Sequence, residues 1–337
     1  MNTRQNSPEN SLIRKIRGIA ARSAESRSGL ELGIGDDAAL FVPRTGYQTI
    51  LTCDWFLEGT HFLRDQHPAN SVGWKSLVRA ASDIAAMGGT PRCFLLSLAL
   101  PTELTGRWLT EFLGGIQRAS RKLHCVMAGG DTTRQTKALI NVAVVGEVKS
   151  GYAIIRSGAR PGDIIYVSGR LGEADLGLAA LRKSRGLVRR DDPILRKHLY
   201  PEPRIALGRW LSDHRLATAM MDLSDGLSTD LARLCEASKV GARIDATHLP
   251  TVRVPKRGRA KSCATKTVDP WALALNGGDD YELLFTVARA KTRRIPRTFH
   301  GVPLTAIGEI TKSPRLILVH PTGGLHLLPA AGWDPFR

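Results

Sequence analysis

Residues 33–39 read Gly-Ile-Gly-Asp-Asp-Ala-Ala, and this stretch decides how the rest of the chain is interpreted. Glycine adopts positive φ at little steric cost, so the two glycines allow a tight turn that aims the carboxylates of Asp36 and Asp37. Taken alone, the stretch is weak evidence for a functional site, because Gly and Asp are also common turn residues. The combination of a small residue with aspartate recurs, however, at Thr52-Cys53-Asp54, Ser82-Asp83, Gly129-Gly130-Asp131, Asp222-Leu223-Ser224-Asp225-Gly226 and Gly277-Gly278-Asp279-Asp280.

Length and composition predict a soluble chain with two domains. The chain has 337 residues, 42% of them hydrophobic and 23% charged, values that are typical of globular proteins of more than one domain. Patterns of strand and helix alternate in both halves, which predicts the α/β class, built as α+β layers. We expect a tail and helix over residues 1–28, an N-terminal domain over 29–150 and a C-terminal domain over 151–337.

The lack of a recognisable targeting signal and the pattern of cysteines predict a cytoplasmic protein. The first ten residues are polar and lack the apolar core of a signal peptide. No apolar run approaches the roughly 20 residues that a membrane span needs. The cysteines are odd in number, far apart and without a CxxC pair, so we expect reduced thiols and neither a disulfide framework nor a zinc site. They are Cys53, Cys93, Cys125, Cys235 and Cys263.

The formal net charge of +17 raises nucleic-acid binding as one hypothesis. Basic residues cluster in Arg182–Arg190, Arg253–Lys266 and Lys291–Arg297. These clusters contain few aromatic residues on which bases could stack. Exposed carboxylates in the Gly/Asp loops would also repel phosphates unless cations intervened. The sequence therefore disfavours nucleic acid as a partner and keeps it as the rival hypothesis from a different class.

Most of the aspartates are expected at the ends of regular elements. We predict strands over Gln48–Cys53, ending at Asp54, over Cys125–Ala128, opening onto Gly129, and over Thr218–Met221, leading into Asp222. Helices are predicted over Asn70–Met87, with Asp83 late in an apolar pattern, and over Leu227–Ser238. Any one of these aspartates is equally compatible with a helix cap or an Asx turn. Asp83 is the exception, because a carboxylate late in an apolar helix is poorly placed unless it faces a site.

Several carboxylates in one site require a cation. Two of them about 4 Å apart repel by about 4 kcal/mol at an effective dielectric near 20. Carboxylate, hydroxyl and carbonyl oxygens are hard ligands that suit Mg²⁺ and not zinc. Known phosphate signatures are missing, since there is no P-loop, and Gly169–Gly172 lacks the first G-x-G of a dinucleotide fingerprint. The residues thus favour a Mg²⁺-assisted phosphoryl-transfer site.

The ordered set of motifs resembles the thiamine-monophosphate kinase family, within the aminoimidazole ribonucleotide synthetase superfamily. The resemblance extends from about residue 30 to the C-terminus. Its motifs are Gly33–Ala39, Thr52-Cys53-Asp54, Ser82–Gly88, Gly129–Thr133, Arg156–Ala159, Asp222–Gly226 and Gly278–Leu283. The resemblance implies a two-domain aminoimidazole ribonucleotide synthetase-like fold, in which the N-terminal domain binds ATP and Mg²⁺ and its sheet forms a homodimer interface.

The resemblance also implies an activity and a set of site residues. The activity is ATP-dependent phosphorylation of thiamine monophosphate to thiamine diphosphate, with several Mg²⁺ ions. The metal ligands would be Asp37, Thr52, Cys53 (through its carbonyl), Asp54, Asp83, Asp131, Asp222 and Asp225. The contacts to ATP would be Gly130, Asp131, Arg156 and Ser224, and the catalytic residues would be Asp54, Asp131 and Arg156. The residues lining the thiamine monophosphate site would be His61, Asp279 and Trp333.

The chemistry of the acceptor agrees with this expectation. A phosphate monoester has a second pKa near 6 and is already an anionic nucleophile at pH 7. No general base is then needed, and catalysis rests on positioning and neutralisation of charge, in a direct in-line transfer. Four features depart from the family. Asp279 replaces a more usual Glu, and Cys53 stands where Thr is common. Lys122-Leu123 lies where an aromatic residue is expected near the adenine, and the basic stretch 253–266 has no assigned role. The nearest rivals are other synthetases of the superfamily, of the selenophosphate or purine-pathway type.

Overall fold

The computed structural model describes residues 8–21, 29–34, 36–184, 192–252 and 269–336. The basic stretch 253–266 and Cys263 lie outside the described residues, as do Gly35 and most of the cluster Arg182–Arg190. The chain divides into two compact units. The first comprises Met1–Ile84 and Gly89–Ser150, and the second comprises Ala85–Gly88 and Gly151–Arg337.

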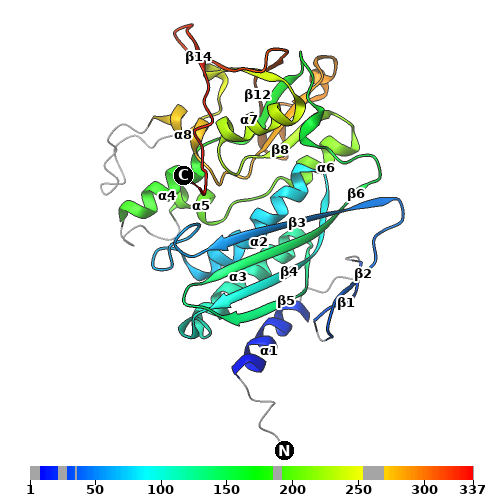
Figure 1. Cartoon of the computed structure of the whole chain (residues 1–337), viewed down its shortest axis with the longest axis vertical. Coiled ribbons are helices and arrows are strands. Elements are labelled where there is room, and N and C mark those ends of the chain that lie inside the picture. Colours follow the sequence, from blue (N-terminus) through cyan, green and yellow to red (C-terminus); the bar gives the residue numbers. More distant parts are fainter. Residues whose placement is uncertain (1–7, 22–28, 35, 185–191, 253–268, 337) are drawn as a thin grey trace, which may run out of the picture. The chain divides into compact units, whose positions relative to one another are not determined.

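The first unit is a sheet with helices on one face. Its elements are α1 (Pro8–Ala21), β1 (Leu30–Leu32), β2 (Leu40–Phe41), β3 (Tyr47–Leu57), α2 (Ala69–Ala86), β4 (Thr90–Leu100), the 3₁₀ turn η2 (Thr102–Leu104), α3 (Arg107–Leu123), β5 (Val126–Arg134) and β6 (Leu139–Lys149). The long strands pair in the order β3-β6-β4-β5, and β4 and β5 run parallel. Figure 1 shows these strands side by side, with α2 and α3 behind them.

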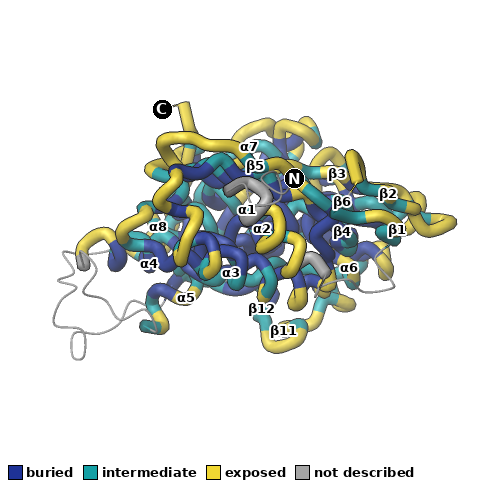
Figure 2. The backbone as a smooth tube through the Cα atoms, turned by 90° about the horizontal axis from the view of Figure 1, so that it is seen from below, coloured by how far each residue is buried: buried dark blue, intermediate teal, exposed yellow. Residues whose placement is uncertain are grey.

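Helices α2 and α3 are held close together by two glycines. A Cβ at Gly73 would overlap the carbonyl of Phe112, and a Cβ at Gly115 would overlap the carbonyl of Asn70. Only glycine allows two helix backbones to approach this closely. Both helices are buried over much of their length, whereas the β1–β2 hairpin is largely exposed (Figure 2).

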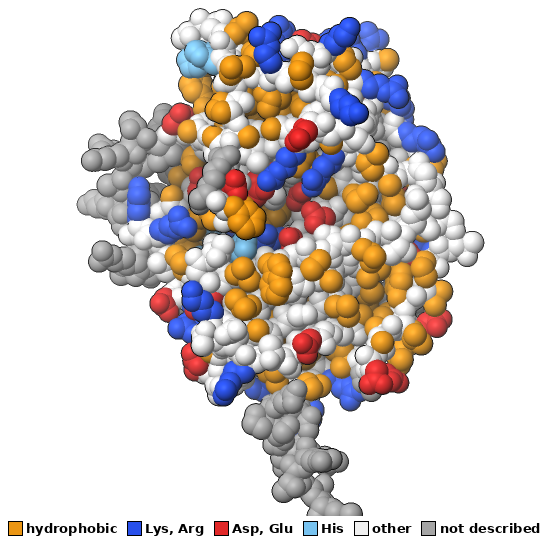
Figure 3. All heavy atoms as spheres, viewed as in Figure 1, with side chains coloured by type: hydrophobic (Ala, Val, Ile, Leu, Met, Phe, Trp, Pro, Cys, Tyr) orange, Lys and Arg blue, Asp and Glu red, His pale blue; other side chains and the backbone are white. Residues whose placement is uncertain are grey.

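The two faces of β3 have different surroundings. Ile50 and Phe56 are buried on the face that α2 covers, while Leu51 and Trp55 are 74% and 55% exposed on the other face. Alternation of this kind is the period of two that a half-covered strand shows. Hydrophobic side chains are spread over the open face of β3, β6 and β4 in Figure 3.

The second unit is a mixed sheet between two helical layers. Its elements are η3 (Arg156–Gly158), β7 (Ile164–Ser168), α4 (Glu173–Ser184), α5 (Pro193–Leu199), α6 (Ile205–Asp213), β8 (Ala217–Asp222), α7 (Leu227–Ser238), β9 (Gly241–Asp245), η4 (Ala246–His248), α8 (Pro270–Asn276), β10 (Leu283–Val287), η5 (Arg289–Arg294), β11 (Thr298–Phe299), β12 (Val302–Thr311), β13 (Leu316–Val319) and β14 (Leu325–Leu327). The strands pair in the order β14-β13-β9-β12-β7-β10-β8, with β11 beside β12.

Successive residues of this sheet point into two different cores. Met221 and Leu284 pack with Leu231 of α7, whereas Met220 and Phe285 pack with leucines of α6 on the opposite face. The strands are therefore apolar on both sides and read as continuous hydrophobic runs. Helix α7, which packs on one of these cores, has the bounds that the sequence pattern predicted, Leu227–Ser238.

Two strand predictions were wrong in length, and both errors involve aspartates of the motifs. β3 continues to Leu57, so Asp54 lies inside the strand and pairs with Val142 of β6. β5 continues to Arg134, so Gly129-Gly130-Asp131 is part of a strand instead of a loop that follows one. Pairing along the full length of β6 and β4 outweighs the turn preference of Gly and Asp.

Two further features concern the predictions about membrane spans and cysteines. No helix in the described part of the chain is long and apolar enough to cross a membrane. The described cysteines carry free thiols, with Cys53 exposed and Cys93, Cys125 and Cys235 buried.

Candidate functional site

In the first unit, β3 and α2 bring two of the predicted metal ligands into contact. The Thr52 hydroxyl donates a hydrogen bond to Oδ2 of Asp83, at 2.5 Å. Both side chains lie between the sheet and the helix, and β3 carries Thr52 on its covered face. A carboxylate late in an apolar helix is explained by this contact, since Asp83 meets a polar partner on the sheet.

Asp54 lies two residues further along the same face of β3. Its Oδ2 is 3.4 Å from Nε of Arg79, which belongs to the same helix as Asp83. The sequence analysis missed Arg79. Its spacing of four residues before Asp83 places the two side chains on one face of α2, and this spacing is the signal that could have identified it.

Cys53 faces away from Thr52 and Asp54. Its side chain is on the open face of the sheet, where Nδ2 of Asn141 donates a hydrogen bond to Sγ at 3.1 Å. This orientation is compatible with the expectation that Cys53 would act through its carbonyl. The thiol itself is directed to the surface that β3 leaves uncovered.

Gly130 lies where β5 runs closest to β4. Its φ is 153°, and a Cβ at this position would overlap the carbonyl of Leu96. The next residue, Asp131, is exposed, and its Oδ1 accepts the amide hydrogen of Thr132 at 2.8 Å. Glycine is therefore required for strand pairing here, a structural role that stands beside its predicted contact with ATP.

The Asp36-Asp37 turn joins β1 and β2 and is exposed. Oδ1 of Asp36 accepts the amide hydrogen of Asp37 at 2.9 Å, so this carboxylate forms a hydrogen bond within the turn. The guanidinium of Arg17, on α1, donates to the carbonyl of Ile34 at 3.1 and 3.2 Å. Among the described residues, no contact joins Asp37 to Thr52 or Asp83.

His61 lies in the turn that follows β3. Its Nδ1 accepts the amide hydrogen of Leu57 at 3.0 Å, so Nε2 carries the proton in the neutral ring. The ring centroid lies 5.8 Å from that of Phe56. The imidazole is thus fixed in orientation and half-buried.

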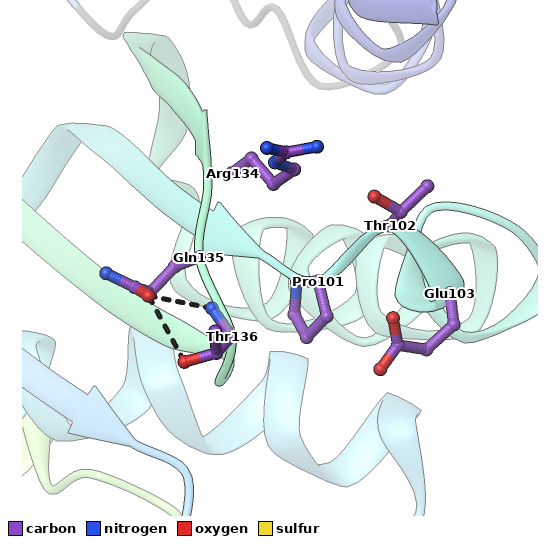
Figure 4. Close-up of a pocket in the computed structure, with 6 residues that line it drawn as sticks. All are labelled: Pro101, Thr102, Glu103, Arg134, Gln135 and Thr136. Carbon is purple, nitrogen blue, oxygen red and sulfur yellow. Dashed lines mark hydrogen bonds between the residues drawn. The ribbon is translucent and has the colours of Figure 1, made fainter.

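A cavity of about 520 Å³ lies at the carboxyl ends of β4 and β5. Strand β5 is the one that carries Gly130. The cavity is lined by Pro101, Thr102, Glu103, Arg134, Gln135 and Thr136 (Figure 4). The Gln135 side chain is turned towards Thr136, whose amide and hydroxyl both donate to Oε1. The lining contains none of the residues predicted for the site.

In the second unit, two loops that are far apart in sequence are joined by backbone hydrogen bonds. The amide of Asp279 donates to the carbonyl of Ser224 at 2.8 Å, and that of Tyr281 donates to Leu223 at 2.9 Å. The amide of Leu223 in turn donates to Glu282 at 2.8 Å. The loop Asp222–Gly226, which follows β8, is therefore fixed against the segment that precedes β10.

Asp230 organises the first of these loops from the first turn of α7. Its Oδ2 accepts the amide hydrogens of Ser224, Asp225 and Gly226 at 3.1, 3.0 and 3.2 Å. Arg233 forms ion pairs with both Asp225 and Asp230. Neither Asp230 nor Arg233 was identified from the sequence, although an acidic side chain in the first turn of a helix is a recognisable capping signal.

The polar side chains of the segment 279–282 form hydrogen bonds with different partners. Asp280 accepts the amide hydrogens of Gly172 and Ala174 and so caps α4, at 2.5 and 3.0 Å. The Tyr281 hydroxyl donates to Oδ1 of Asp279 at 2.7 Å. Both Asp279 and Tyr281 have positive φ, 66° and 50°, a conformation that residues other than glycine rarely adopt.

Glu282 is fully buried and is held by three partners. Lys197 and Arg204 form ion pairs with its carboxylate, and the Ser168 hydroxyl donates to Oε2 at 2.5 Å. Burial raises the pKa of Glu282, but the attraction of Lys197 and Arg204 outweighs it and lowers the pKa to about 2. The carboxylate is therefore ionised and paired at neutral pH.

The pKa values of two nearby aspartates are shifted in the opposite direction. Burial raises the pKa of Asp280 to about 7, against the attraction of Lys197 and two backbone hydrogen bonds. Burial and the charge of Asp225 raise the pKa of Asp230 to about 6. Raised carboxylate pKa values next to the predicted ligands are typical of functional sites.

Trp333 is attached to the same loop by its backbone. Its amide donates to the carbonyl of Asp225 at 2.8 Å, and the preceding amide of Gly332 donates to the Thr229 hydroxyl at 3.0 Å. The Trp333 side chain remains 48% exposed. The C-terminal segment is thus fixed at the loop while its indole is available for stacking.

Arg156 lies beside β8. The carbonyl of the preceding Ile155 accepts the amide hydrogen of Met220 at 3.4 Å, and the Arg156 carbonyl accepts from the Ser238 hydroxyl at 2.7 Å. The residue itself is exposed. The described contacts thus anchor its backbone, and none of them joins its guanidinium to Ser224.

The donor atoms fit Mg²⁺ in type. Within the described residues, no group of three or more His, Cys, Asp or Glu side chains is gathered as a metal site. Mg²⁺ does not need one, because it is commonly held by one or two carboxylates with waters and substrate phosphates. The Thr52–Asp83 pair in the first unit and the Asp222–Gly226 loop in the second each offer hard oxygen donors.

Comparison with known proteins covers both units. The chain matches the family models "AIR synthase related protein, N-terminal domain" over residues 35–148 and "AIR synthase related protein, C-terminal domain" over residues 160–321. It is 38% identical over 294 residues to the thiamine-monophosphate kinase of Escherichia coli K12, covering 86% of this chain and 87% of that protein. It is 33% identical over 332 residues to the Bacillus subtilis enzyme of that name, with 96% and 98% covered.

Solved structures give the same relationship. The thiamine-monophosphate kinase of Stenotrophomonas maltophilia K279a is similar with a TM-score of 0.78 and 34% identity, over 91% of this chain and 95% of that one. AaThiL complexed with AMPPCP and TMP is similar with a TM-score of 0.74 and 31% identity, over 95% and 96%. The hydrogenase maturation protein HypE shares the fold alone, at 19% identity. These similarities confirm the two-domain fold expected from the sequence.

Proposed function

The chain belongs to the thiamine-monophosphate kinase family, and we propose that it transfers the terminal phosphoryl group of ATP to thiamine monophosphate, giving thiamine diphosphate and ADP. The observation that carries the proposal is the joining of Asp222–Gly226 to the segment 279–282, in a chain similar over 95% of its length to AaThiL complexed with AMPPCP and TMP.

We assign metal binding to the oxygen donors of both units. In the first unit these are the side chains of Asp37, Thr52, Asp54, Asp83 and Asp131 with the carbonyl of Cys53, and in the second they are Asp222 and Asp225. Bound Mg²⁺ would supply neutralisation of the charge on the transferring phosphoryl group. The contact between Thr52 and Asp83 and the position of Asp225 in the loop that is joined to the segment 279–282 support this assignment.

The remaining site residues are assigned by their chemistry. Gly130 and Ser224 offer backbone and hydroxyl groups to the nucleotide, and Arg156 offers a permanent positive charge to the phosphates. Asp279 and Trp333 suit the cationic, aromatic part of thiamine monophosphate, because a carboxylate pairs with the charge and an indole stacks on the ring. His61 presents Nε2–H as a donor, since Nδ1 is already occupied.

The transfer is direct, without a covalent enzyme intermediate. The acceptor phosphate is anionic near pH 7 and attacks the terminal phosphorus of ATP without a general base. Asp54 and Arg156 then act by holding charge in place. Direct transfer predicts that labelled ADP is not incorporated into ATP when thiamine monophosphate is omitted, and rapid exchange in that reaction would contradict it.

The open face of the first sheet is proposed to pair with a second copy of the chain. Leu51, Trp55 and Leu95 are exposed on that face, and a contiguous apolar surface of this kind marks an interaction site. The Trp55→Lys variant is expected to shift the molar mass measured by light scattering from dimer to monomer. A wild-type protein that is already monomeric would contradict the homodimer.

The activity assay tests the main proposal. Purified protein with ATP, Mg²⁺ and thiamine monophosphate is expected to yield thiamine diphosphate and ADP in equal amounts, and none after chelation of Mg²⁺. Thiamine in place of its monophosphate controls for a kinase of the free alcohol. Turnover of thiamine alone, or no turnover of either acceptor, would overturn the proposal.

The rival hypotheses have weaker support. Similarity to HypE at 19% identity concerns the fold alone and gives no argument for another synthetase activity. The charge of +17 remains the one observation that favours nucleic-acid binding. A salt titration decides this point, because phosphate contacts weaken steeply as salt rises and an absence of binding at physiological salt would exclude them.

A further inference from the structure

Tyr281 contacts Asp279, the carboxylate that is proposed to bind the substrate. Its side chain is 2% exposed, and its hydroxyl donates a hydrogen bond of 2.7 Å to Oδ1 of Asp279. A buried hydroxyl that donates to a charged carboxylate forms one of the stronger kinds of hydrogen bond. The tyrosine ring is therefore a fixed support whose one polar atom is directed at Asp279.

The backbone around this contact is strained. Asp279 and Tyr281 both have positive φ, a conformation in which Cβ crowds the following carbonyl. The two amide bonds to Ser224 and Leu223 hold the segment in this shape. Strained conformations of this kind persist where the surrounding structure fixes them, and they gather at binding and catalytic sites.

The strain has a geometric consequence. Between the two residues, Asp280 turns inwards and caps α4, while Asp279 and Tyr281 meet side chain to side chain. The short arm of Asp279 rotates about its terminal torsion unless something fixes the carboxylate plane. The hydrogen bond from the Tyr281 hydroxyl to Oδ1 restricts this rotation.

We propose that Tyr281 is a positioning residue for substrate recognition, whose hydroxyl orients the Asp279 carboxylate towards the cationic part of thiamine monophosphate. The inference rests on the proposed function and extends it to a residue that does not itself touch the substrate. Tyr281 acts through Asp279 and has no part in binding ATP or in the phosphoryl transfer.

The Tyr281→Phe variant isolates this role, because it removes one oxygen and keeps the buried ring. KM for thiamine monophosphate is expected to rise about tenfold, a change that corresponds to about 1.4 kcal/mol. The value of kcat is expected to stay within about twofold and KM for ATP to remain unchanged, because Asp279 is assigned to thiamine monophosphate and not to ATP or to the transferring phosphoryl group.

Tyr166→Phe is the matched control. Tyr166 is also a buried tyrosine of the second unit, on β7, with its ring stacked on Phe285 at a centroid distance of 5.4 Å. Loss of its hydroxyl is expected to leave both KM values and kcat unchanged. A change of equal size in both variants would show a general effect of removing a buried hydroxyl and would overturn the proposal.

A double-mutant cycle with Asp279→Asn gives the decisive test. If Tyr281 acts through Asp279, adding Tyr281→Phe to Asp279→Asn raises KM for thiamine monophosphate by less than twofold further. Independent, additive effects, or an unchanged KM in Tyr281→Phe alone, would overturn the inference while leaving the kinase activity of the wild type intact. A wild type that makes no thiamine diphosphate would overturn both.

Discussion

The two units hold their predicted site residues by different means. In the first, Thr52, Asp54 and Asp131 lie inside paired strands, and Asp83 lies inside a helix. In the second, the loop Asp222–Gly226 and the segment 279–282 lie between regular elements and are fixed to each other by their backbones. In the first unit the positions of the site residues are thus set by the alternation and register of the strands. In the second unit they are set by hydrogen bonds between loops.

This difference has consequences for rigidity and for substitution. Along a strand, alternate residues are committed to opposite faces, so a side chain such as Thr52 has one possible partner across the interface with α2. A loop has no such period, and its side chains are oriented by individual contacts such as the one from Tyr281 to Asp279. We therefore expect changes in strand backbone to affect the first unit most, and changes in buried polar groups to affect the second.

The largest effect is expected from Gly130→Ala in the first unit. The new Cβ would overlap the carbonyl of Leu96 on the neighbouring strand, so β5 and β4 must separate. We expect a loss of more than about 4 kcal/mol in the free energy of unfolding, measured by urea denaturation, or failure to fold.

Gly129→Ala is the control for this substitution. Its Cβ would lie 3.2 Å from Cδ2 of Leu95, the end of a flexible and partly exposed side chain. A loss below about 1 kcal/mol is expected. Equal losses in the two variants would contradict the importance that we give to strand approach at Gly130.

An effect of about 3–5 kcal/mol is expected from Glu282→Gln in the second unit, because it leaves Lys197 and Arg204 unpaired in a buried place. The pKa of Glu282 is lowered from 4.5 to about 2, so its contribution to stability is present above pH 4.5 and is lost as the pH falls through 2. Wild type and variant should therefore converge in acid.

Glu309→Gln serves as the matched control. Glu309 is partly exposed and pairs with Arg289 at 3.0 Å and with Arg243 at 3.3 Å on the surface. Its loss should cost no more than about 1 kcal/mol. If the two glutamines destabilise equally, the loops of the second unit do not depend on the buried pair.

The smallest effect is expected from Thr52→Val, which removes the hydroxyl that donates to Asp83. We expect a loss of about 1.5–3 kcal/mol in the free energy of unfolding, the range for a hydrogen bond to a charged group. Thr49, exposed on the same strand, provides the comparison, and Thr49→Val should change stability by less than about 0.5 kcal/mol. Indistinguishable variants would show that the contact between β3 and α2 adds nothing.

The elements that could be predicted from the sequence are those with an unbroken apolar pattern. Helix α7 has the bounds predicted for it, and α2 lies within one residue of its predicted bounds at each end, because the buried face of each helix gives an apolar pattern of helical period. By contrast, β3 and β5 were cut short, since Asp54 and Gly129–Asp131 resemble turn residues. Their place within strands is decided by pairing with β6 and β4, which no local pattern reveals. The sequence analysis gave no prediction for the short, charged α5, whose buried face is formed by Leu195 and Leu199 packing with Leu181 of α4.

The candidate site residues could be named from the sequence, whereas the contacts that hold them in place could not. The repeated Gly/Asp motifs pointed to the segments that carry the candidate residues, and the resemblance to a family named Asp37 among the metal ligands. The bonds between Ser224 and Asp279 could not be predicted, because they join backbones more than fifty residues apart and leave no trace in side-chain type. The positive φ of Tyr281 is equally invisible, since tyrosine rarely adopts it.

Formation of thiamine diphosphate by the wild type and by Asp225→Asn tests the central claim most directly. Asp225 lies in the loop that joins the segment 279–282, and the substitution removes one charge without changing side-chain size. We expect ATP- and Mg²⁺-dependent thiamine diphosphate from the wild type, and none above background from a variant that keeps its thermal stability. Wild-type protein without this product, or full turnover in the variant, would contradict the account.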